Sequence, residues 1–161
     1  EPSCLLTFSD EFKTLKGLTN REQLKNKFFL LEEFILDQIK IKNKINHINF
    51  DKEVIIHGHC HQKSQNRMKG LFKLLDTFNI KYKMIDSSCC GMAGSFGYNS
   101  KNYDISKKMA YLSLIPEINK TDKNAFILAN GTSCRHQISD FSERKPKHIA
   151  ELLFNLFERI N

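Results

Sequence analysis

Apolar residues recur at helical spacing in four segments of the chain. In the first, residues 21–40, one helix face collects Leu24, Phe28, Leu31, Ile35 and Ile39. The same spacing predicts helices over 68–78, over 103–115 with a stop before Pro116, and over 149–160. Each of these segments is expected to bury one face against the rest of the molecule.

Three short segments have the pattern of β-strands. Residues 54–56 and 126–128 are continuous apolar runs, which are typical of buried strands. Residues 80–84 alternate between apolar and lysine side chains, which indicates a strand with one face in water. From residue 53 onward, strands and helices alternate. This order predicts an α/β fold with a parallel sheet, right-handed crossovers and helices on the faces of the sheet.

Each predicted strand runs into a loop that carries cysteine. Cys60 follows the first strand, the adjacent pair Cys89 and Cys90 follows the second, and Cys134 follows the third. Because ligands of open α/β sheets sit beyond the carboxyl ends of the strands, we expect these sulfurs to meet at one edge. Converging thiolates indicate an iron–sulfur cluster, since soft sulfur donors suit iron. Two unrelated buried thiols are the alternative for the adjacent pair.

Glycines follow the cysteine pair at every third position: Gly91, Gly94 and Gly97. Without a Cβ, the backbone at these positions can bring N–H groups close to an anionic cluster and tune its potential through bonds to sulfur. A glycine-rich turn that leads into a helix is the simpler interpretation of the same pattern.

The histidines of the chain allow a zinc site instead. His57, His59 and His61 share a face if the chain stays extended there, and imidazole with thiolate is a good donor set for zinc. No cysteine pair has the spacing usual for zinc, so hydrogen bonds to the centre are the more ordinary role. His136, which follows Cys134 and Arg135, is a candidate for an extra ligand or a proton relay, or it faces solvent.

Composition narrows the class of protein. The chain has 161 residues, of which 40% are apolar, so it can bury a core as one domain. No apolar run approaches the ~20 residues that span a bilayer. Five cysteines without an export signal indicate reduced thiols in the cytoplasm, where clustered cysteines bind metal or do redox chemistry. The net charge of +7 comes from dispersed lysines, which indicate a solvated surface and no nucleic-acid partner.

A short internal repeat suggests how the chain is divided. Ser3-Cys4 precedes Ser9-Asp10 at the same offsets at which Ser133-Cys134 precedes Ser139-Asp140. We interpret residues 1–50 as the tail of a preceding repeat plus a linking helix, and residues 51–161 as a complete cysteine-rich domain. The whole chain is then expected to be a C-terminal fragment of a larger protein.

Three motifs, residues 57–63, 89–98 and 131–137, resemble the cysteine-rich domain named for its Cys-Cys-Gly signature. This domain occurs in the heterodisulfide reductase catalytic subunit and in the iron–sulfur subunits of glycolate oxidase and anaerobic glycerol-3-phosphate dehydrogenase. The motifs most resemble FAD-linked oxidases of the D-lactate or D-2-hydroxyglutarate dehydrogenase type, and the likeness includes residues 1–4. Heterodisulfide reductase has Cys-x-x-Cys where this chain has Gln137 at the second position, which favours a four-thiolate site over a five-cysteine double cluster.

The resemblance implies a module that passes electrons from a reduced flavin, through iron–sulfur centres, to an acceptor. It assigns a 4Fe-4S cluster to Cys60, Cys89, Cys90 and Cys134, with Cys4 serving the other repeat. The partners would be flavin-binding and ferredoxin-like domains of the same polypeptide or complex. FAD would be bound by the flavin-binding domains. Peripheral association of the complex with the inner face of the membrane is compatible with the resemblance. The rivals are an assembly domain with reduced or zinc-bound cysteines and a zinc hydrolase, for which these motifs offer no carboxylate base.

Overall fold

The computed structural model describes residues 1–17, 27–42 and 50–158. The strands are β1 (Val54–Ile56), β2 (Tyr82–Met84) and β3 (Phe126–Leu128). The described helices are α1 (Pro2–Ser9), η1 (Glu11–Thr14), α3 (Leu31–Lys42), α4 (Cys60–Ser64), α5 (Lys69–Thr77), η2 (Phe96–Tyr98), η3 (Ser100–Asn102), α6 (Tyr103–Leu112), α7 (Leu114–Lys120), α8 (Thr132–Phe141) and α9 (Ile149–Glu158).

The three strands form one parallel sheet in the order β2-β1-β3. Val54 of β1 lies opposite Tyr82 of β2 on one side and Phe126 of β3 on the other. Because all three strands run in the same direction, the segments that follow them leave the sheet at the same edge. The α/β fold expected from the alternation of strands and helices is therefore confirmed.

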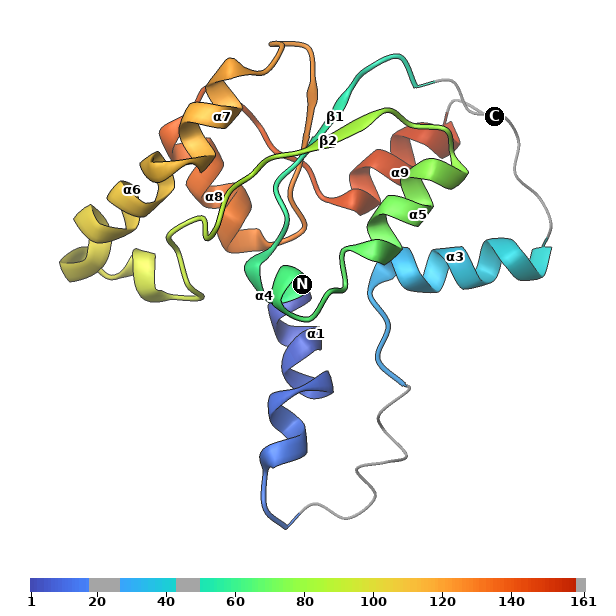
Figure 1. The fold of residues 1–161 in the computed structure, drawn as a ribbon, viewed down its shortest axis with the longest axis horizontal. Helices are drawn as coiled ribbons and strands as arrows, with labels where there is room; N and C mark the ends of the chain where they lie inside the picture. Colours follow the sequence, from blue (N-terminus) through green and yellow to red (C-terminus); the bar gives the residue numbers. More distant parts are fainter. Residues whose placement is uncertain (18–26, 43–49, 159–161) are drawn as a thin grey trace.

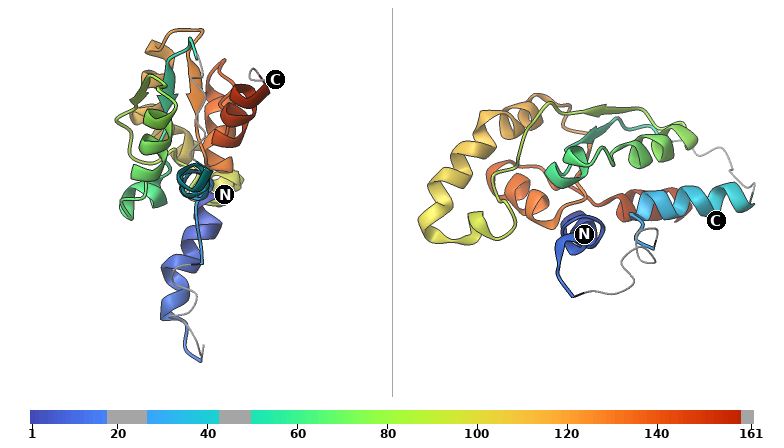
Figure 2. Two further views of the ribbon diagram at one scale, coloured as in Figure 1. Left: turned by 90° about the vertical axis from the view of Figure 1, so that its right-hand side faces the viewer. Right: turned by 60° about the horizontal axis from the view of Figure 1, so that its bottom comes forward.

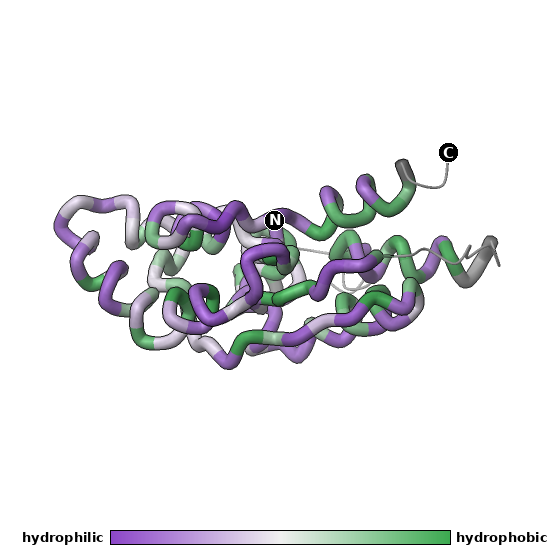
Figure 3. Tube along the Cα trace, turned by 90° about the horizontal axis from the view of Figure 1, so that it is seen from above, coloured by the Kyte–Doolittle hydropathy of each residue, from purple (hydrophilic) through white to green (hydrophobic). Residues whose placement is uncertain are grey.

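Helices cover both faces of the sheet (Figures 1 and 2). Val54 and Ile56 of β1 point to one face and pack against α5 and α9, with α3 alongside. Ile55 points to the other face, where residues of α6, α7 and α8 pack together with the loop after β2. The trace coloured by hydropathy shows hydrophobic and hydrophilic stretches alternating along these helices, as expected for layers that bury one side (Figure 3).

The first predicted helix begins later than expected. Residues 18–26 lie outside the described part of the chain, but residues 27–30 are described and are not helical, so the prediction was wrong at Phe28. The helix starts at Leu31, because the Glu33 carboxylate accepts the N–H of Leu30 at 2.9 Å and so caps the first turn. Leu31, Ile35 and Ile39 do lie on this helix.

The prediction that a helix stops before Pro116 was also wrong. The chain breaks at Ser113, whose ψ of −46° and φ of −150° separate α6 from α7. Pro116 lies in the first turn of α7, where its missing N–H would have no helical acceptor. The proline therefore helps to start a second helix. The last predicted helix is confirmed as α9 up to Glu158, and Ile160 lies outside the described residues.

The chain does not stay extended after β1, as a shared face for the three histidines would require. α4 begins at Cys60, with His59 as its N-cap. Successive side chains of a helix differ in direction by about 100°. His61, in the first turn of α4, therefore points in a different direction from His57. The three histidines consequently do not line up on one face as ligands of a single metal ion.

α1 projects away from the sheet, and its first residues lie beside the edge that carries the cysteines (Figure 1). The Glu1 carboxylate accepts the N–H and the hydroxyl of Thr132, both at 2.8 Å, and so caps α8. Both α1 and α8 begin two residues before a cysteine, Cys4 and Cys134. The division of the chain at residue 50 stays a prediction. Among the described helices, none has the length and apolar character needed to cross a bilayer.

Candidate metal centre

The structure brings four cysteines to one cavity at the carboxyl edge of the sheet. Cys60 is the first residue of α4, Cys89 and Cys90 lie in the loop after β2, and Cys134 lies in the first turn of α8. All four line the same cavity of about 430 Å³, with Ala93, Gly94 and Ser133 between them. Cys60 is exposed, whereas Cys90 and Cys134 are buried, so the cavity runs from the surface into the protein.

The four sulfurs are close enough to share protons. Hydrogen bonding to Cys89, followed by burial, raises the pKa of Cys60, and hydrogen bonds with Cys60 and Cys90 lower the pKa of Cys89. Hydrogen bonds to Cys134 and Cys89 raise the pKa of Cys90, and the bond with Cys90 lowers the pKa of Cys134 to about 5. The four sulfurs therefore form a continuous chain of neighbouring groups that exchange hydrogen bonds, and in their deprotonated, thiolate form such groups bind metal.

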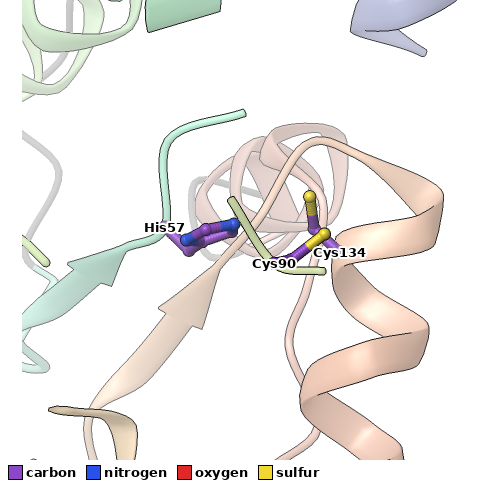
Figure 4. Close-up of side chains that lie close together, drawn as sticks. All are labelled: His57, Cys90 and Cys134. Carbon is purple, nitrogen blue, oxygen red and sulfur yellow. The ribbon is translucent and has the colours of Figure 1, made fainter. Parts of the chain in front are cut away.

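His57 belongs to the buried end of this cluster. A ring nitrogen of His57 and the sulfurs of Cys90 and Cys134 all lie within 4.8 Å of one another. Figure 4 shows the imidazole, which directly follows β1, turned toward the two sulfurs. Nδ1 bonds to the Ser87 hydroxyl at 2.9 Å, and Nε2 has no hydrogen-bond partner within the described residues. From the sequence, His57 is considered only as one of three alternating histidines with His59 and His61. Their spacing alone gives no reason to single out His57 as the one beside the cysteines.

Polar side chains hold the three cysteine-bearing segments together. Lys63 of α4 donates to the carbonyl oxygens of Ser87 and Ser88, just before the cysteine pair. The Ser133 hydroxyl, beside Cys134, donates to the Gly94 carbonyl at 3.2 Å. The positions of the sulfurs thus depend on contacts between loops that are far apart in the sequence.

The loop after the cysteine pair turns tightly around Cys89. The N–H of Gly91 donates to the Cys89 sulfur at 3.3 Å. Gly91 and Gly94 have φ values of +95° and +69°, in the left-handed region that favours glycine. A Cβ at Gly91 would also collide with the Ser106 carbonyl oxygen. This turn brings the Gly91 N–H to the Cys89 sulfur, while the role of the three glycines around a bound cluster stays a prediction.

His59 and His61 lie in the lining of the cavity but have other partners. His59 Nδ1 accepts the N–H of His61 at 3.3 Å, which caps α4, and burial lowers the pKa of His59. His61 Nε2 lies 3.0 Å from Gln65 Nε2 and 3.7 Å from Glu11. The structure therefore gives these two histidines a supporting position around the sulfurs.

The candidates near α8 point elsewhere. Exposed His136 contacts the Tyr98 hydroxyl at 2.5 Å through Nδ1, and Arg135 donates to the carbonyls of Ala129 and Asn130. Buried Gln137 donates to Ser106, at 3.1 Å to its carbonyl and 3.0 Å to its hydroxyl. Neither His136 nor Cys4, which is exposed on α1, is among the residues that line the cavity.

The donor set fits a metal centre of soft ligands. Converging thiolates suit iron–sulfur clusters, and thiolate with imidazole suits zinc. Among the described residues the buried Nε2 of His57 has no hydrogen-bond partner at ordinary distance, and since buried polar atoms are almost always paired, it adds a nitrogen donor to the sulfurs beside it. A separate, wider groove of about 1230 Å³ lies between α6, α7 and the segment before α9; the described residues that line it include no cysteine or histidine.

The chain is similar to known dehydrogenases over nearly its whole length. It is 26% identical to D-2-hydroxyglutarate dehydrogenase of Pseudomonas putida over 99% of the chain, and 25% identical to that of Haemophilus influenzae over 98%. It is 24% identical to a subunit of the anaerobic glycerol-3-phosphate dehydrogenase of Escherichia coli over 63% of the chain. These relatives confirm the resemblance seen in the motifs.

The chain spans only part of these relatives: 15% and 16% of the two D-2-hydroxyglutarate dehydrogenases, and 25% of the glycerol-3-phosphate dehydrogenase subunit. No family model matches the chain. No solved structure matches it either.

Proposed function

We propose that this chain is the iron–sulfur electron-transfer module of an FAD-linked 2-hydroxy-acid oxidoreductase. The observation that carries the proposal is the meeting of Cys60, Cys89, Cys90 and Cys134 in one cavity. The similarity to dehydrogenases supports an oxidoreductase role. The centre we propose is a 4Fe-4S cluster, because four cysteines converge and Gln137 is turned toward Ser106.

Each residue around the cavity has a definite task in this proposal. The four cysteines hold the cluster, which when bound would supply one-electron chemistry. The Gly91 N–H reduces the negative charge on Cys89 by donating to its sulfur. Buried Cys90 and Cys134 keep their side of the site away from water, and exposed Cys60 marks the side where a redox partner can approach.

The other parts of the reaction would belong to other domains. The hydroxy acid and FAD would bind in flavin-binding domains of the same polypeptide or complex, and ferredoxin-like domains would pass electrons to or from this module. The complex would work in the cytoplasm, with the inner face of the membrane as one place to deliver electrons.

Anaerobic purification tests the proposal. The chain should be brown, with visible absorption and with iron and acid-labile sulfide in similar molar amounts. Oxygen must be excluded, because exposed thiolates oxidise and clusters are lost. A colourless protein without iron or sulfide, even after reconstitution with Fe²⁺ and sulfide, would contradict an electron-transfer role.

A zinc-binding assembly domain is the second candidate, and one observation favours it. His57, Cys90 and Cys134 form a buried three-ligand group within 4.8 Å, and Cys89 lies beside them as a fourth donor. Imidazole with thiolates is a common structural zinc set. Such a domain would dock the flavoprotein portion without carrying electrons. Stoichiometric zinc in a colourless protein purified without oxygen would support this candidate over the first.

A further inference from the structure

Glu32 is an almost completely buried carboxylate that serves none of the tasks described above. It lies in the first turn of α3, and only 1% of its surface is exposed. Its Oε1 accepts hydrogen bonds from Gln62 Nε2 at 2.9 Å and from Asn130 Nδ2 at 3.4 Å. Acidic side chains are rarely buried to this extent unless a cation or a metal pairs with them.

The two amide donors come from the segments that deliver cysteines. Gln62 lies in α4, two residues after Cys60. Asn130 follows β3, four residues before Cys134, and its own Oδ1 accepts the N–H of Ile149 at 3.1 Å. A single carboxylate oxygen on α3 therefore bridges two segments, α4 and the loop after β3, that bring sulfurs to the cavity from different strands.

The neighbouring carboxylate, Glu33, has a different role. It forms an ion pair with Arg67, accepts the N–H of Leu30, and is partly exposed. Arg67 and Glu33 are the charged groups that influence Glu32, and burial outweighs Arg67, so the pKa of Glu32 is raised. Holding an ionisable group in such a place opposes folding.

We propose that Glu32 is a positioning residue for the metal centre: it holds α4 and the segment between β3 and α8 at the spacing that lets Cys60 and Cys134 reach one metal. The inference deepens the proposed function, since it rests on metal binding by these thiols. It does not require the metal to be iron.

Co²⁺ alone is the probe, titrated without oxygen into the reduced, metal-free full chain. The absorption bands of thiolate-bound Co²⁺ report both the affinity of the site for Co²⁺ and the coordination geometry of the bound ion. Glu32→Ala should weaken Co²⁺ binding about tenfold or more, the range seen when groups that orient metal ligands are removed. Glu32→Gln keeps an oxygen that can accept both amides and should bind within about threefold of wild type.

Two controls separate positioning from loss of stability. Glu33→Gln removes the same charge from the next residue and should leave Co²⁺ binding unchanged. Leu156→Ala makes a cavity in the core around α9, a region without cysteine ligands, and should lower the melting temperature without weakening Co²⁺ binding. If Leu156→Ala weakens Co²⁺ binding as much as Glu32→Ala does, the positioning role is overturned.

Hydrogen exchange on the metal-free chain distinguishes the failure of this inference from the failure of the metal site. Glu32→Ala should speed exchange in α4 and at residues 130–134 together, whereas Glu33→Gln should not. Unchanged exchange in both segments overturns the positioning role even if Co²⁺ binds. If the wild-type chain binds no Co²⁺ but Glu32→Ala still speeds exchange in both segments, the metal site is overturned. Glu32 would then remain as the residue that bridges α4 and the loop after β3.

Discussion

The imidazole of His57 and the thiol of Cys134 face each other across the carboxyl ends of two neighbouring strands (Figure 4). His57 follows β1 directly, and its N–H donates to the Leu128 carbonyl at the end of β3, at 2.9 Å. The sheet register therefore fixes the backbone of His57, and the Ser87 hydroxyl fixes the orientation of its ring. Nε2, which has no hydrogen-bond partner in the described part of the chain, lies beside Cys90 and Cys134.

His57→Ala is expected to weaken metal binding at the cysteine site. The variant loses the imidazole nitrogen that lies beside the two buried sulfurs, so Zn²⁺ affinity should fall about tenfold to a hundredfold, as it does when a metal site loses an orienting or ligating group. Competition with a chromophoric chelator measures the affinity. His136→Ala, which removes an exposed histidine outside the cavity, is the matched control and should bind as wild type does. Equal affinity in His57→Ala and wild type would remove His57 from the site.

Cys90→Ser is expected to abolish cluster retention while leaving the fold intact. Cys90 lies between Cys89 and Cys134 in the chain of sulfurs, and a serine hydroxyl is a poor substitute for a soft thiolate donor. Iron and sulfide analysis after anaerobic reconstitution should fall toward zero, with little change in far-UV circular dichroism. Cys4→Ser, an exposed cysteine on α1, should retain the wild-type iron content. A Cys90→Ser variant that keeps all its iron would exclude this cysteine as a ligand.

The sheet and the meeting of the cysteines could be predicted because both follow from the order of the elements. Once the three strands are known to be parallel, the segments that carry Cys60, Cys90 and Cys134 must leave the sheet at one edge. The role of His57 could not be predicted, because it depends on α4 beginning at Cys60 and turning His61 away. Glu32 gave no signal either: at the start of an amphipathic helix, an acidic residue usually faces water and stabilises the helix dipole.

Gly91→Ala is expected to destabilise the protein more than Gly94→Ala. Both residues have positive φ, so alanine is strained at both positions, by about 1 kcal/mol. Only at Gly91 would the new Cβ collide with the Ser106 carbonyl; at Gly94 nothing lies within 4 Å. We expect Gly91→Ala to lose about 2–4 kcal/mol of unfolding free energy, by analogy with overpacked buried sites. Urea unfolding of both variants measures the difference, and equal losses would show that backbone strain alone matters.

Glu32→Gln is expected to gain stability relative to wild type as pH rises. Burial raises the pKa of Glu32 in the folded protein above its ordinary value of 4.5. Between that value and the raised folded value, the folded state holds more protons than the unfolded state. The stability of wild type therefore falls as pH rises through this window.

Glutamine does not titrate, so it lacks this loss. The unfolding free energy of Glu32→Gln minus that of wild type should increase from pH 4 upward and level off above the folded pKa. Urea unfolding at a series of pH values measures this difference in unfolding free energy. Glu33→Gln is the control, because it removes a carboxylate from a partly exposed position on the same helix turn. A difference that stays constant across this pH range would mean that Glu32 ionises as readily in the folded protein as in the unfolded chain, and the burial that raises its pKa would then have no energetic consequence.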